Sequence, residues 1–590
     1  MFTPQLRVPV QKVITDSYQG VLPDVVSVQN WLNSRDHFDC QDFLDTIVGL
    51  NRVHCEPSVR MEIMNLIDSD IQEELEKLYK KTASAAFPIN EEYQALSDTL
   101  QYLLLESSVA YQIIIHDIAA KEDYINQYIG SLIPEALFLA LFYLSDLLVE
   151  RFQLYLSEPV HIWEELNQLY LLAERIGAQD DKIRAHTSIK NKYLQISILK
   201  MLNPYRLMHL EARKIYHLLE TWEGYCEIAS YVEQTPENHF VVNLLADVPP
   251  HFYNEKNDSK KNESTDFEGR VLKMDRLRDY LDSYLEKVDQ QKETHVFSYQ
   301  SRMHNEMLQR IDNEIEMHEE RSEERVFAGN EIKLVSGLRA CHHFLNNRKP
   351  FKPQEEIDNQ LAQKLEENQP NDDSGINLIN LIEEERLLSR KNPMGELQSI
   401  NPFMGETEII GDEWEHIHAT SVINANFNMT QKQLNASLKE ESWRQRNESD
   451  HGMLLVSKND IEMPIAVGML VAFRLKVEKA YCLAVVKWLR VNPKKGMAIG
   501  LKVMAVQARA LAVKGEEGAG SGGHFNRAFL ISESKTNAKG DKMHLILPAG
   551  IYDKDSIIKV WHNKKVEQVR IIKILSATDS FEKVSFQVLH

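Results

Sequence analysis

The sequence contains little cysteine and no paired cysteine motif. Its five cysteines are far apart and odd in number, and no CxxC pair occurs among Cys40, Cys55, Cys226, Cys341 and Cys482. This usage is typical of a reducing compartment and argues against a disulfide framework or a structural zinc site. The start of the sequence also lacks the charged and then apolar pattern of a secretory signal, so we expect a cytoplasmic protein.

Positive charge is scarce as well. The formal net charge of the chain is −21 at pH 7. A protein that binds duplex nucleic acid needs clustered lysine and arginine to release counterions from the phosphates, so we expect no DNA partner. A small anionic ligand is still compatible with this charge, because two or three local arginines can hold one.

Long uncharged apolar runs are missing too. The most hydrophobic stretch, Ala136 to Ser145, is bracketed by Glu135 and Asp146, so its uncharged run is ten residues long. A membrane-spanning helix needs about 20 consecutive apolar residues. We therefore expect no membrane span and interpret this stretch as a buried core helix.

No constellation of catalytic or metal-ligating residues stands out. The sequence has no GxSxG motif, and the glycines between Gly518 and Gly523 are not followed by GK[ST]. The run Cys341-His342-His343 looks like a metal cluster, but adjacent helical residues point about 100° apart and cannot share one ion. We nominate no catalytic residue and no metal ligand, and we expect the protein not to be an enzyme.

The N-terminal part has the periodicity of helices. At 590 residues the chain is long enough for several domains. From Val28 to Leu219 apolar residues recur at steps of three and four, as in the stripe of Trp163, Leu166, Leu169, Tyr170 and Ala173. This pattern predicts about six to nine antiparallel helices. We assign residues 1–250 to an irregular helical bundle, which resembles no family that we can name.

Charge density rises after this bundle. Residues 251–352 begin with a polar loop, His251 to Gly269, and continue as charged helices with short strands at 325–327 and 332–335. Residues 353–412 hold 14 acidic and 4 basic residues, which predicts a disordered acidic insertion. Within it, Ile376 to Leu388 has the pattern of a short amphipathic helix, either a docking motif for a partner or a nascent helix.

The C-terminal part changes to a period of two with many β-branched residues. Eight or so short strands are expected from Glu413 onward, which indicates a barrel or a sandwich. We assign 413–513 to an antiparallel β-barrel, 514–524 to a glycine-rich linker and 525–590 to a second small β-module. The predicted fold class is multidomain α + β.

One short motif in this region carries a ligand hypothesis. Asn447-Glu448-Ser449-Asp450-His451-Gly452 lies directly before a strand and follows two arginines, Arg444 and Arg446. It matches the [D/N]xSxxG pattern of PilZ domains, and the strands Val485 to Trp488 and Ile499 to Val503 are similar to the closing strands of a PilZ barrel. The resemblance covers residues 443–505. It implies a bacterial signalling domain that binds cyclic-di-GMP.

The resemblance is incomplete. PilZ domains that bind ligand usually carry an RxxxR element 20 to 30 residues before this motif, and the corresponding window, Glu415 to Asn428, contains no arginine. Arg444 and Arg446 are the nearby candidates, and RxR spacing on a strand places both on one face. The predicted ligand residues are therefore arginines for phosphate or guanine and a turn that shapes the guanine contact: Arg444, Arg446, Asn447, Ser449 and Gly452.

The resulting hypothesis is a non-enzymatic regulatory protein that responds to cyclic-di-GMP. It would act through a protein partner bound by the helical module or by the acidic insertion. Three alternatives stay open: a ligand-independent scaffold with a degenerate PilZ fold, an enzyme whose site lies in the helical bundle, and a helical regulator that touches RNA polymerase or ribosomal components through the acidic insertion.

Overall fold

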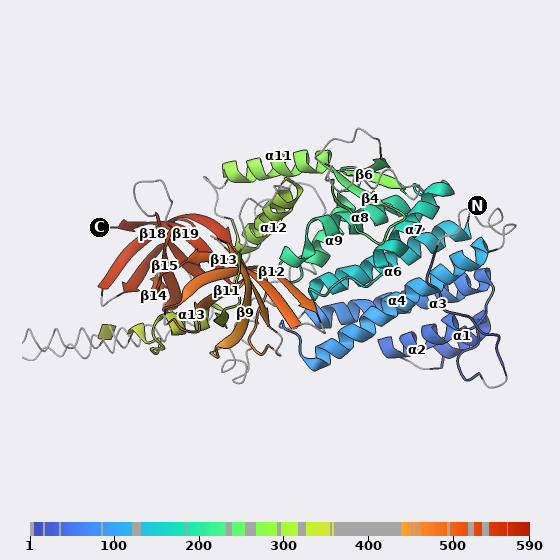
Figure 1. Cartoon of the computed structure of the whole chain (residues 1–590), viewed down its shortest axis with the longest axis horizontal. Coiled ribbons are helices and arrows are strands. Elements are labelled where there is room, and N and C mark those ends of the chain that lie inside the picture. The colour runs from blue at the N-terminus through green and yellow to red at the C-terminus, as the bar shows by residue number, and fades with distance from the viewer. Residues whose placement is uncertain are drawn as a thin grey trace, which may run out of the picture.

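Three bodies follow one another along the molecule, with a helical module at one end, a middle barrel in the centre and a C-terminal barrel at the other end (Figure 1). This computed structural model describes residues 5–15, 18–34, 37–83, 87–120, 131–183, 187–231, 239–253, 267–291, 297–316, 326–354, 357–358, 438–449, 452–457, 461–478, 480–492, 496–516, 524–533, 542–562 and 565–589. The predicted acidic insertion lies almost wholly outside these residues.

The helical module confirms the bundle expected from the apolar periodicity. Several of its helices begin at a side chain that accepts a backbone N–H, as at Asp24, Asp39, Asn90 and Ser188. The described helices are α1 (Val25–Leu32), α2 (Cys40–Asn51), α3 (Pro57–Ala83), α4 (Glu91–Ala119), α6 (Leu132–Gln153), α7 (Ile162–Arg175), α8 (Ile189–Met201) and α9 (Glu211–Thr221), with the short pair β1 (Lys182–Ile183) and β2 (Thr187–Ser188) and the 3-10 turn η1 (Pro204–Arg206).

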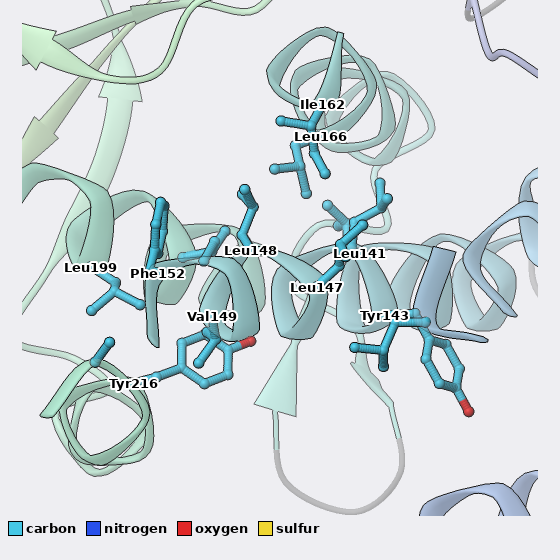
Figure 2. Packing of buried hydrophobic residues seen from close by; sticks show 14 of the residues in the cluster. Leu141, Tyr143, Leu147, Leu148, Val149, Phe152, Ile162, Leu166, Leu199 and Tyr216 are labelled. Carbon is cyan, nitrogen blue, oxygen red and sulfur yellow. The ribbon is translucent and has the colours of Figure 1, made fainter. Parts of the chain in front are cut away.

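Helix α6 is the core of this bundle. Its side chains meet those of α7, α8 and α9 on different sides, as Leu141, Leu148, Ile162, Leu199 and Tyr216 show (Figure 2). Among the described residues, α6 is the one helix long and apolar enough to cross a membrane by length and composition, yet 83% of that window is buried in the protein. The prediction of a buried core helix is confirmed.

A small sheet that the sequence analysis missed follows the bundle. The stretch expected to be a loop from His251 to Gly269 begins and ends in strands. The sheet has the order β3-β6-β4-β5, formed by β3 (Glu227–Ser230), β4 (Phe240–Asn243), β5 (His251–Phe252) and β6 (Gly269–Lys273). Strands of two to five residues are too short for an alternating pattern to be recognised. The charged helices expected next are α11 (Asp275–Gln291) and α12 (Tyr299–Glu316).

The middle barrel closes through a strand from before the acidic insertion. Its sheet runs β10-β13-β12-β11-β8-β9, and β9 pairs back with β10. The strands are β8 (Glu331–Ser336), β9 (Glu441–Ser449), β10 (Gly452–Ser457), β11 (Leu470–Leu475), β12 (Cys482–Asn492) and β13 (Gly496–Ala505), with the two-residue β7 (Val326–Phe327) beside β9. The barrel therefore starts well before the expected boundary at 413, because the insertion separates β8 from β9 in the sequence but not in space.

The C-terminal barrel is also closed, in the order β14-β15-β16-β19-β18-β17. It consists of β14 (Ala508–Gly515), β15 (Asn526–Glu533), β16 (Lys542–Pro548), β17 (Ile557–His562), β18 (Lys565–Ala577) and β19 (Phe581–Leu589). The segment 514–524, expected to link two domains, instead connects the paired strands β14 and β15. The sequence of β14 alone does not indicate which of the two barrels the strand joins.

Helix α13 (Leu338–Leu345) fills the space between the two barrels. Its Cys341 and Phe344 pack in one hydrophobic cluster with Leu470 of the middle barrel and Phe529 of the C-terminal barrel. The ring of His342 is buried, and its Nε2 lies 2.9 Å from the carbonyl oxygen of Leu511. Cys341 and His342 therefore pack at the junction of the barrels, and no metal-ligating group of three is found among the described residues.

The helical module rests directly on the middle barrel, and the interior of that barrel belongs to the same hydrophobic cluster as the bundle. The backbone N–H of Val491 on β12 donates to the carbonyl of Tyr155 at 2.8 Å. The guanidinium of Arg490 lies 4.1 Å from the ring centroid of Tyr205. The middle barrel and the helical module are therefore in direct contact.

Helix α12 ties the C-terminal barrel to the rest of the protein through Arg302. Its Nε donates to Glu582 at 3.0 Å, and its terminal nitrogen lies 2.7 Å from Asp553. The Glu582 side chain is only 1% exposed, and burial raises the pKa of its carboxyl above the ordinary 4.5. Such a buried carboxylate depends on its cationic partner, because a lone buried charge is strongly destabilising.

We expect Arg302→Gln to lower the free energy of unfolding by about 3 kcal/mol at pH 7, because the substitution leaves the Glu582 carboxylate buried without a cation. The pKa of Glu582, already raised, would rise further, so the carboxyl binds a proton more readily in the folded protein. The stability lost through the substitution should therefore become smaller as the pH falls toward 4.5. Thermal unfolding at pH 7 and pH 5 measures this, with Glu582→Gln added to Arg302→Gln as the control that should recover most of the loss.

Candidate ligand site at the β9–β10 turn

Burial alternates along β9 as expected for a strand with one face toward the barrel interior. Trp443 and Gln445 are buried, and Asn447 and Ser449 continue this set as half-buried residues near the end of the strand. Arg444, Arg446 and Glu448 form the exposed set. The alternation thus assigns the two predicted arginines and the two predicted turn residues to different faces of the same strand.

A β-bulge interrupts the pairing of β9 with β10 at this point. Asn447 lies opposite Leu454 and Gln445 opposite Leu455, so Arg446 is the extra residue of the bulge. Bulges bend a strand and redirect its side chains, and they are frequent next to functional sites. The bulge here immediately precedes the predicted motif.

The buried Gln445 fixes the base of the hairpin. Its side-chain oxygen accepts from Asn330 Nδ2 at 3.0 Å, and its Nε2 donates to Glu448 at 2.6 Å. The Gln445 backbone N–H also donates to the Asn330 carbonyl at 2.9 Å. These contacts hold the residues between β7 and β8 against β9, and the sequence analysis did not identify them.

Gly452 is required by the approach of a neighbouring strand. A Cβ at this position would lie 2.9 Å from the carbonyl oxygen of Leu501 on β13. Across the turn, Gly452 pairs with Ser449, whose hydroxyl makes only a long 3.5 Å contact with the Gly452 carbonyl. The hydroxyl is therefore held weakly and is available for a stronger hydrogen bond. Asp450 and His451 lie outside the described residues.

Trp488 packs against the same strand β13. A Cβ on Gly500 would lie 1.9 Å from the indole Nε1 of Trp488, so the ring lies directly on the glycine. A register shift between Val486 and Trp488 accompanies this contact. The aromatic ring and the glycine together fix the position of β13, against which the β9–β10 hairpin rests.

The structure brings together three of the five predicted site residues. Asn447, Ser449 and Gly452 lie around the β9–β10 turn. Arg444 and Arg446 are on the exposed face of β9, and among the described residues neither side chain forms an ion pair or a hydrogen bond. The Cα partner of Arg444 is Glu331 on β8.

Strand β7 points to an arginine pair that the sequence analysis missed. Phe327 of β7 pairs with Asn447, and Val326 pairs with Glu448. The residue bonded to Val326 is Arg325, and Arg321-Ser-Glu-Glu-Arg325 has the RxxxR spacing that was absent from 415–428. Both arginines lie outside the described residues. In the sequence, the acidic insertion separates this element from the NxSxxG motif, whereas β7, the strand beside the end of β9, comes from before the insertion.

Three family models match the chain in succession. They are described as the cyclic-di-GMP receptor FimW N-terminal domain at residues 28–234, its middle PilZ domain at 239–510 and the FimW C-terminal β-barrel domain at 511–589. The chain belongs to the FimW family. The cyclic-di-GMP receptor FimW of Pseudomonas aeruginosa PAO1 is 21% identical over 513 residues, which is 82% of this chain and 77% of that protein. No solved structure matches the chain.

The FimW models confirm and extend the sequence analysis. The PilZ resemblance of residues 443–505 is confirmed, and the matched domain is much larger, since it reaches back to residue 239. The helical module, which the sequence alone assigned to no family, is the FimW N-terminal domain. The second β-module is the FimW C-terminal barrel, and the boundary between the models falls inside β14.

We expect Gly500→Ala to destabilise the middle barrel by about 2 kcal/mol, because the new methyl group collides with the indole ring of Trp488. Thermal unfolding followed by tryptophan fluorescence measures both the lower midpoint and the displaced indole. Gly329→Ala is a matched control, since a Cβ there meets nothing within 4 Å. Equal midpoints for the two variants would contradict the packing role of Gly500.

Proposed function

We propose that this FimW family protein binds cyclic-di-GMP at the β9–β10 turn and acts as a non-enzymatic regulator. The observation that carries the proposal is the pairing of Phe327 with Asn447, because it brings the chain that follows the RxxxR element to the NxSxxG turn. This pairing supports joining the RxxxR element, which ends one residue before β7 in the sequence, with the NxSxxG motif in one ligand site. The name of the P. aeruginosa relative, a cyclic-di-GMP receptor, supports the same ligand class.

The residue types suit a cyclic dinucleotide with two phosphates and two guanines. The amide of Asn447 and the hydroxyl of Ser449 offer hydrogen bonds to a guanine edge, while Gly452 lets the turn approach the base closely. Arg321 and Arg325 are the proposed phosphate ligands, because a guanidinium can fork onto phosphate and stack on a purine. Arg444 and Arg446 are the second candidates for this role, since both are exposed on β9, the strand that also carries Asn447 and Ser449.

Ligand binding would affect a protein partner through the contact between the middle barrel and the helical module. A ligand shifts a conformational equilibrium only if it binds the two states differently. The middle barrel contacts the helical module through Tyr155 and Tyr205. We propose that occupancy of the turn alters this contact and so changes the surface that the helical module presents to a cytoplasmic partner.

Calorimetric titration of the full chain with cyclic-di-GMP tests the proposal. We expect one saturable binding event, which Arg321→Ala/Arg325→Ala weakens by about 100-fold, because each charge-assisted hydrogen bond is worth about 1.5 kcal/mol or more. Ser449→Ala should weaken it by about fivefold, the loss of one neutral hydrogen bond. Cyclic-di-AMP serves as the control ligand for guanine recognition.

The variant Arg444→Ala/Arg446→Ala distinguishes the two sets of arginines. An unchanged affinity assigns the phosphate contacts to Arg321 and Arg325, whereas a loss confined to this variant assigns them to the exposed face of β9. If the unmodified chain takes up no cyclic-di-GMP while its thermal unfolding is cooperative, the ligand proposal is wrong and a ligand-independent scaffold is the better description.

A further inference from the structure

A group of basic side chains surrounds α13 at the junction of the two barrels. From Gly337 to Lys352 the sequence has four basic residues, Arg339, Arg348, Lys349 and Lys352, and no acidic residue. Arg527 of β15 joins this group from the C-terminal barrel. We call Arg339, His343, Arg348 and Arg527 the basic cluster. It stands out in a chain whose net charge is −21.

Aromatic contacts hold two of these arginines in place. The guanidinium of Arg527 lies 4.4 Å from the ring centroid of Phe351, and that of Arg348 lies 5.0 Å from the ring centroid of Phe344. Cation–π contacts of this kind orient a guanidinium without neutralising its charge. Arg348 and Arg527 are therefore cations held in defined positions.

The positive field at the cluster is only partly compensated. Burial lowers the pKa of His343, and the nearby charges of Arg348, Arg527 and Arg339 lower it further. Arg348 pairs with Glu440 at 3.0 Å, whereas Arg339 and Arg527 form no ion pair among the described residues. Bringing like charges together costs free energy, which an anionic group at this surface would offset.

The segment with the required charge starts beside the cluster. Residues 353–412 hold 14 acidic and 4 basic residues. This acidic segment begins directly after Lys352, in the same stretch as Phe351, which packs under Arg527. A tethered partner has a high effective concentration at a nearby surface, about millimolar for a short flexible connection. We propose that the basic cluster is the docking surface for the chain's own acidic segment.

This docking surface is separate from the proposed ligand site. The cluster meets β9 at its first end, where Glu440 precedes the strand, while the NxSxxG motif includes the last residue of the strand, Ser449. A strand rises about 3.3 Å per residue, so the nine residues of β9 place the two sites roughly 25–30 Å apart. Docking would therefore cover the junction of the barrels without occupying the turn.

Limited trypsin digestion of the full chain tests the docking. Arg386, Arg390 and Lys391 are tryptic sites within the acidic segment. We expect Arg339→Glu/Arg527→Glu to accelerate cleavage there by about fivefold, the effect of losing two exposed ion pairs. High salt should accelerate cleavage of the unmodified chain to a similar extent and leave the variant unchanged, because the attraction is screened.

Matched variants separate docking from a loss of stability. Lys565→Glu/Lys573→Glu makes the same number of charge reversals on β18, which lies across the C-terminal barrel from β15, and should leave cleavage unchanged. Glu383→Gln/Glu384→Gln/Glu385→Gln changes the segment alone and should accelerate cleavage as the arginine variant does. Equal cleavage rates in the unmodified chain, the arginine variant and the glutamate variant would overturn the proposal. Cyclic-di-GMP affinity is measured in parallel and should not change, so this test stands apart from the ligand proposal.

Discussion

The pairing of β8 with β9 is the constraint on which the architecture depends. Leu334 lies opposite Glu441, and this contact closes the middle barrel although the predicted acidic insertion separates the two residues in the sequence. The same pairing aligns β7 with the end of β9, beside Asn447. The chain leaves β8 at the junction of the two barrels, forms α13 at this junction and returns later as β9. Without this pairing, neither the candidate ligand site nor the junction of the barrels would exist.

Polar contacts hold the two ends of the insertion together. Arg348 precedes the insertion and pairs with Glu440, which directly precedes β9, and Glu440 also accepts from Arg474 at 2.9 Å. Burial alone would raise the pKa of Glu440, but hydrogen bonds from Tyr481 and Arg474 and the charge of Arg348 lower it, so the carboxylate stays ionised. The entropic cost of closing a loop grows only by about 0.6 kcal/mol for each doubling of its length. A long insertion is therefore tolerated wherever its ends are fixed in this way.

Most of the secondary structure could be predicted from the sequence, and the errors share one cause. Repeating patterns within a continuous stretch were interpreted correctly, as for α6 and for the expected strands at 485–488 and 499–503, which lie within β12 and β13. Features that depend on contacts between distant residues were not. The barrel boundary at β8 and the membership of β14 in the second barrel each required a pairing that no local pattern shows. The bulge at Arg446 likewise depends on β10 and is invisible in β9 alone.

The distribution of charge follows from the same topology. The chain is acidic as a whole, but the residues on α13 and just after it are basic. Opposite charges therefore lie next to each other where the acidic segment begins. A sequence with these charges interspersed would neutralise them locally, pair by pair. Here the basic residues 339–352 and the acidic residues after 354 are arranged in separate blocks. Glu440 pairs with Arg348, and the proposed docking would bring the second block back to Arg339 and Arg527. Since the first block lies on α13 and the chain just after it, where both barrels meet, such a contact would join the acidic segment to the one helix that packs against both of them.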